Sequence, residues 1–201
     1  EVQLPLGEPI ILSVATSRLL GKDLARKFDK ELTIRPDRKD FESTLEAAAG
    51  QFIAHRGRNI WVNAGYPWFG RWGRDTMISL PGLTLAFNDY ELFRKLFTDL
   101  VSEARDGLLP NVGEPDQAAL WAMAALHHFY IQDPVAFKTF YSKAKIGAFM
   151  REVIELFTQS NGKGRDIYLD ENGLIWTGAP STALTWMDAV VAGIPVTSRS
   201  G

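Results

Sequence analysis

One short segment combines the two kinds of side chain that bind a sugar ring. The stretch AGYPWFGRWGRDT places four aromatic rings before a guanidinium and a carboxylate; these residues are Tyr66, Trp68, Phe69, Trp72, Arg74 and Asp75. Aromatic rings cover the apolar C–H face of a pyranose. The carboxylate accepts hydrogen bonds from its hydroxyl groups and the guanidinium donates to them. The segment therefore indicates a carbohydrate site.

The same residues also fit a structural role. Asp75 could cap a helix that begins here, because short polar side chains are common at helix N-termini. Arg74 could pair with it, and the rings could fill the end of the domain. Composition taken alone favours this structural role slightly.

A second candidate is Asp188 in the stretch LTWMDA, where it follows Trp186 in an apolar neighbourhood. Loss of solvation raises the pKa of such a carboxyl, which allows it to donate a proton near neutral pH. The alternative is an acid stabilised by the dipole at a helix N-terminus. For the isolated motif this alternative is the stronger one.

Other chemistry has little support in the 201 residues. His127 and His128 lack the spacing of a metal pair, His55 is isolated, and Glu114 and Asp116 fit solvated loop acids. Cysteine is absent, and we expect no metal and no cofactor. The net charge of -2, with interspersed signs, argues against nucleic acid or an anionic membrane as partner.

The elements that must position these residues are mostly helical. Apolar spacing predicts helices near 16–30, 41–55, 75–87, 90–105, 116–131 and 145–159, with a short one after Pro134 and Asp116 as an N-cap. Asn172-Gly173 predicts a hairpin or tight turn. We expect the loops 56–74, 106–115 and 160–185 to gather at one end, as in a toroid of helical hairpins.

Several longer stretches share one resemblance. They are AAAGQFIAHRG, the segment around WGRD, RDGLLPNVGEPDQAALW, NGLIWTGAPSTALTWMDA and GIPVTSRSG, in this order from residue 47 onward. Together they resemble the amylo-α-1,6-glucosidase module of bacterial and archaeal glycogen debranching enzymes. The order of the matches favours a carbohydrate site over the structural roles suggested for Arg74-Asp75 and for Asp188.

The resemblance implies an (α/α)6 toroid preceded by a β-rich domain. Residues 1–15 would be a remnant strand of that domain, 16–39 a helix and linker, and 40–201 the first half of the toroid. The implied activity is hydrolysis of α-1,6-linked glucose at branch points of a glycogen-like α-glucan, and the implied location is the cytoplasm.

The resemblance also assigns roles to particular residues. Trp72, Arg74 and Asp75 would bind the glucose at the cleavage site, and Tyr66, Trp68 and Trp186 would contribute further rings. Asp188 would be the general acid of an inverting mechanism, with a second carboxyl ~6.5–9.5 Å away to activate water.

Two features depart from the family pattern. The general base has no counterpart in this chain, so we expect an incomplete catalytic domain that is inactive by itself. The alternative is a carbohydrate-binding remnant without turnover. In addition, Asp116 lies one residue from the position of the expected acid, which leaves its contact role doubtful.

Overall fold

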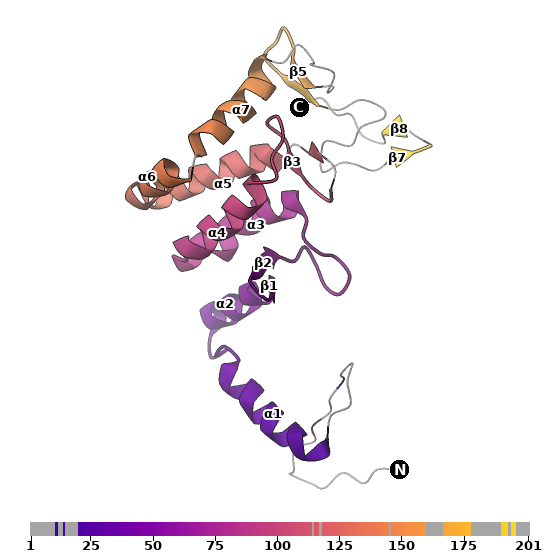
Figure 1. Ribbon diagram of the computed structural model, residues 1–201, viewed down its shortest axis with the longest axis vertical. Coiled ribbons are helices and arrows are strands. Elements are labelled where there is room, and N and C mark those ends of the chain that lie inside the picture. Colours follow the sequence, from indigo (N-terminus) through magenta and orange to yellow (C-terminus); the bar gives the residue numbers. More distant parts are fainter. Residues whose placement is uncertain are drawn as a thin grey trace. The chain divides into compact units, whose positions relative to one another are not determined.

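The computed structural model describes residues 11, 14, 20–113, 115–116, 118–144, 146–159, 167–177, 190–192 and 194–195. Helices dominate this part of the chain (Figure 1). Two compact units are present, residues 1–48 and 49–201. None of the helices in the described part is long and apolar enough to cross a membrane.

The first unit holds α1 (Gly21–Ile34) and most of α2 (Phe41–Gln51). α2 begins with a reciprocal cap. The Asp40 carboxylate accepts hydrogen bonds from the Ser43 hydroxyl at 2.7 Å and the Ser43 amide at 2.8 Å, and the Asp40 amide donates to Ser43 Oγ at 3.1 Å. The bonds from Ser43, the hydroxyl first, lower the pKa of Asp40.

The second unit contains the remaining helices: α3 (Gly73–Leu83), the 3-10 turn η1 (Leu85–Phe87), α4 (Tyr90–Val101), α5 (Ala118–Gln132), α6 (Pro134–Lys143) and α7 (Ile146–Gln159). Local sequence explains two of the starts. Asp89 accepts from the Leu92 amide at 2.9 Å, and Asp133 accepts from the Val135 and Ala136 amides at 3.1 and 2.8 Å. The helices predicted in this region are present, with ends shifted by a few residues.

The strands form antiparallel pairs: β1 (Ile53–Arg56) with β2 (Asn59–Val62), β3 (Leu109–Pro110) with β4 (Pro115–Asp116), β5 (Ile167–Leu169) with β6 (Ile175–Thr177), and β7 (Val190–Val191) with β8 (Ile194–Pro195). The turn predicted at Asn172-Gly173 joins β5 to β6, and Gly173 has a φ of 79°. In this hairpin the Asp170 carboxylate accepts from the amides of Leu174 and Asn172 and from Trp176 Nε1. These bonds, that from Leu174 first, lower the pKa of Asp170.

At two places the structure has a strand where the sequence predicted helix. The helix expected to continue to His55 ends at Gln51, because Gly57 (φ 63°) lets the chain reverse in two residues and pair β1 with β2. The second error concerns Asp116, which was expected to be the N-cap of a helix. It instead pairs with Leu109 in β4, and α5 begins at Ala118.

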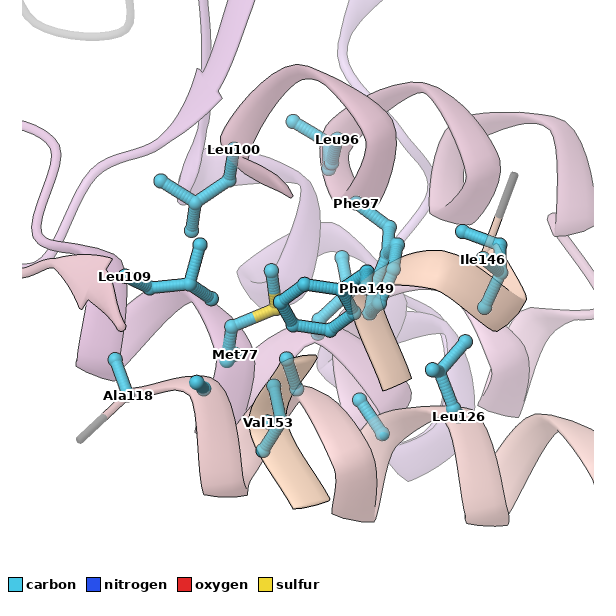
Figure 2. Packing of buried hydrophobic residues seen from close by; sticks show 14 of the residues in the cluster. Met77, Leu96, Phe97, Leu100, Leu109, Ala118, Leu126, Ile146, Phe149 and Val153 are labelled. Carbon is cyan, nitrogen blue, oxygen red and sulfur yellow. The ribbon is translucent and has the colours of Figure 1, made fainter. Parts of the chain in front are cut away.

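One apolar core joins the helices of the second unit. Figure 2 shows Met77 of α3, Phe97 of α4, Leu126 of α5 and Phe149 of α7 among its members. Aromatic rings form its centre: Phe93 stacks on Phe97 with centroids 5.6 Å apart. Phe93 also meets Phe129 edge to face at 4.9 Å. Such pairs stabilise by about 0.5–1.5 kcal/mol beyond the area they bury.

Two isoleucines of α7 test this core. Ile146 is 1% exposed and Ile154 is 48% exposed. Ile146→Ala removes methyl and methylene groups from a packed site and should lower the free energy of unfolding by about 2–5 kcal/mol. Ile154→Ala should change it by less than about 1 kcal/mol. Urea denaturation followed by circular dichroism measures both, and equal losses would contradict the described packing.

Candidate functional site

The first turn of α3 is capped by a residue from a distant loop. Trp72 occupies the N-cap position, and no side chain of the neighbouring sequence accepts a bond there. The carbonyl of Asn111 accepts from the Gly73 amide at 2.9 Å, and its side-chain Oδ1 accepts from the Arg74 amide at 3.1 Å. Asn111 thus satisfies two of the amides that a helix start leaves without partners inside the helix.

Glycine at position 73 is required by this close approach. A Cβ atom built on Gly73 would lie 2.0 Å from the carbonyl oxygen of Pro110, which is backbone and cannot rotate away. The loop that follows β3 therefore lies directly against the first turn of α3. Two of the loops that were expected to meet at one end, 56–74 and 106–115, do meet here.

The predicted binding residues of α3 differ in burial. Arg74 is buried, with 6% of its surface exposed, whereas Asp75 is half-buried. The Asp75 carboxylate makes no hydrogen bond or ion pair with the part of the chain that the structure describes. Its backbone carbonyl accepts from Ser79 Oγ at 2.7 Å. Within the described residues, Asp75 therefore neither caps α3 nor pairs with Arg74, as the structural role suggested from the sequence would require.

The aromatic residues lie on a loop that closes on itself. The Ala64 amide donates to the Gly70 carbonyl at 2.9 Å, which joins the two ends of the loop. Trp68 is 80% exposed and Tyr66 is 62% exposed, although the Tyr66 hydroxyl donates to the Gln51 carbonyl at 2.6 Å. The rings are thus held on the surface rather than buried as a plug.

One of these rings connects the loop to α3. Phe69 meets Trp72 edge to face, with centroids 5.7 Å apart. Trp72 directly precedes the first turn that carries Arg74 and Asp75. The arrangement offers hydrogen-bonding groups and aromatic surface close together, which is the combination that a hydroxylated ring needs.

Other predicted residues lie elsewhere. Trp186, Asp188 and Glu114 fall outside the described residues, and so does the rest of the LTWMDA motif. His127 and His128 are exposed on α5. Within the described part, no group of three His, Asp or Glu side chains is placed to hold a metal ion.

Sequence reasoning missed the residue that caps α3. Asn111 lies 37 residues from Arg74 along the chain. No local sequence pattern distinguishes Asn111 from an ordinary loop asparagine, so its role as a cap could not be predicted. Gly73 was included in the motif, but the reason for a glycine there became clear only from the neighbouring Pro110 carbonyl.

A comparison with protein families identifies the class of protein. Residues 47–201 match the family model described as amylo-alpha-1,6-glucosidase. The chain belongs to this family, whose members are glycosidases of the glycogen-debranching type. No curated protein matches the chain significantly.

Two glycines of α3 test the cap. Gly73→Ala should lower the free energy of unfolding by about 1–3 kcal/mol or more, because the added Cβ overlaps the Pro110 carbonyl. Gly82→Ala is the matched control, since its Cβ would have no neighbour within 4 Å. It should stabilise by roughly 0.5–1 kcal/mol through helix propensity. Denaturant titrations compare them, and a harmless Gly73→Ala would refute the close approach.

Proposed function

We propose that this chain supplies the glucose-binding residues and the general acid of an enzyme that hydrolyses α-1,6-linked glucose at branch points of glycogen-like α-glucans, and that by itself it has no turnover because it lacks the general base. The family match supports a glycosidase and a glucan substrate. The observation that carries the proposal is the start of α3, where buried Arg74 and half-buried Asp75 follow exposed aromatic rings. We further propose that residues 40–201 form the first half of an (α/α)6 toroid, after a helix with linker (16–39), in a cytoplasmic protein; the strand expected from residues 1–15 lies almost wholly outside the described residues.

In this proposal Trp72, Arg74 and Asp75 bind the terminal glucose. The Asp75 carboxylate accepts hydrogen bonds from sugar hydroxyls. No group in the described part of the chain competes with the sugar for this carboxylate. The exposed rings of Tyr66 and Trp68, together with Trp186, cover the apolar faces of the sugar.

Asp188 supplies the proton in the proposed chemistry. Its carboxyl protonates the glycosidic oxygen as the C–O bond breaks, and the leaving glucan departs as an alcohol. A second carboxylate removes a proton from a water that attacks the anomeric carbon on the opposite face, which inverts its configuration. The two carboxyl groups must be ~6.5–9.5 Å apart so that the water fits between.

The binding role of Asp75 is tested by Asp75→Asn. The substitution keeps the shape but removes the charge, and a lost charged hydrogen bond costs roughly 1.5–3 kcal/mol. Glucose or malto-oligosaccharide affinity should fall by about 10- to 100-fold in isothermal titration calorimetry. Glu155→Gln, on the exposed side of α7, should leave affinity unchanged. Unchanged affinity in Asp75→Asn would rule out the binding role.

The proton donor is tested by Asp188→Asn. In an enzyme that carries this chain together with the second half of the proposed toroid, turnover of a branched α-glucan should fall by at least ~10²-fold, the lower end of general-acid contributions. The loss should be much smaller with α-glucosyl fluoride, because fluoride leaves without protonation. Glu155→Gln again serves as control. Full activity of Asp188→Asn on the glucan, or an equal loss on both substrates, would contradict the assignment.

A further inference from the structure

A cleft lies between the β1–β2 hairpin and the C-terminal end of α4. Its volume is about 570 Å³, which is within the range of roughly 300–1,000 Å³ that small-molecule sites occupy. The lining residues are Arg56, Asn59, Ile60, Trp61, Arg71, Asp99, Ser102 and Glu103. None of the residues predicted to bind the terminal glucose is among them.

The pleat of β2 places two of the lining residues, Asn59 and Trp61. Val62 is 3% exposed and belongs to the core, so Asn59 and Trp61 lie on the opposite side of the strand. Arg56 pairs with Asn59 across the hairpin and brings a guanidinium to the same edge. The hairpin therefore presents one indole ring beside an amide and a guanidinium.

α4 forms the opposite wall of the cleft, because one side of the helix is buried in the core and the other is exposed. Phe93, Phe97 and Leu100 are buried in the core, whereas Asp99 and Ser102 are exposed. Lys95 Nζ donates to the Arg58 carbonyl at 3.4 Å, which connects α4 to the hairpin turn. The Arg71 guanidinium forms an ion pair with Glu103 and joins the loop before Trp72 to this wall.

The charges and chemistry of the lining favour a neutral, hydroxylated ligand. Two arginines, Arg56 and Arg71, are balanced by two acids, Asp99 and Glu103, so the lining has no formal net charge. A phosphate-bearing ligand would need an excess of positive charge. Amide, hydroxyl, carboxylate and guanidinium groups provide both donors and acceptors, and Trp61 adds an aromatic ring, the kind of group that packs against the C–H groups of a sugar.

We propose that this cleft binds a linear segment of α-glucan outside the cleavage site. The inference rests on the proposed function for its choice of sugar. Arg71 lies one residue before Trp72, so the cleft adjoins the predicted glucose site along the chain. A glucan held here would keep its branch at a high effective concentration near that site, and long substrates would gain affinity that short ones lack.

The experiment measures maltoheptaose binding by titration calorimetry in the Asp75→Asn background, which weakens the predicted glucose site. Adding Asn59→Ala and Asp99→Ala should reduce affinity about tenfold or more, because hydrogen bonds to hydroxyls are lost from both walls. The control adds Glu171→Ala and Asn172→Ala, an exposed acid and amide outside the cleft, and should leave affinity unchanged.

Thermal unfolding checks that these variants stay folded, and Arg56→Ala, at the exposed hairpin end, serves as a second cleft variant. Loss of maltoheptaose affinity in the cleft variants alone supports the proposal. Unchanged affinity, or equal loss in the control, overturns it. Because the readout is binding of a linear glucan, it is separate from branch hydrolysis. Intact maltoheptaose binding without branch hydrolysis, in an enzyme that also carries the second half of the proposed toroid, would disprove only the proposed function.

Discussion

The close approach of the Pro110–Asn111 backbone to the first turn of α3 is the constraint on which the candidate site depends. It leaves no space for a side chain at Gly73, and Asn111 accepts hydrogen bonds from the amides of Gly73 and Arg74. The helix start, and with it the backbone of Arg74 and Asp75, is therefore fixed by a residue from another loop. The start of α3 is thus held by one hydrogen bond between backbone groups and by one to the short side chain of Asn111.

The core explains how the two loops come to meet. α3 packs against α5, and the rings of Phe93, Phe97 and Phe129 join α4 and α5 in the same cluster. β3 carries Leu109 into that cluster (Figure 2), so the next two residues, Pro110 and Asn111, reach the first turn of α3. Apolar packing thus fixes the place where the loop meets the first turn of α3. Trp68 is not part of this core, and 80% of its surface is exposed.

The family match and the physical arrangement support one interpretation from independent directions. The match identifies a glycosidase family over residues 47–201. Within the described part of the chain, the Asp75 carboxylate neither caps α3 nor pairs with Arg74. The cleft beside β2 adds a second surface of the same chemical character, a ring with balanced donors and acceptors. Both surfaces suit a polymer of neutral sugars.

The sequence by itself determined the elements whose signals are local. Asp89 and Asp133 cap α4 and α6 through amides two or three residues away, and Asn172-Gly173 reverses the chain between β5 and β6. The motif residues of the candidate site could also be named from the sequence, because their types suit sugar chemistry. Only the tertiary structure decided the role of Asn111, the requirement for Gly73, the end of α2 at Gln51 and the place of Asp116 in β4. Each of these depends on a partner brought close by packing or strand pairing, and such partners leave no periodic pattern in the neighbouring sequence.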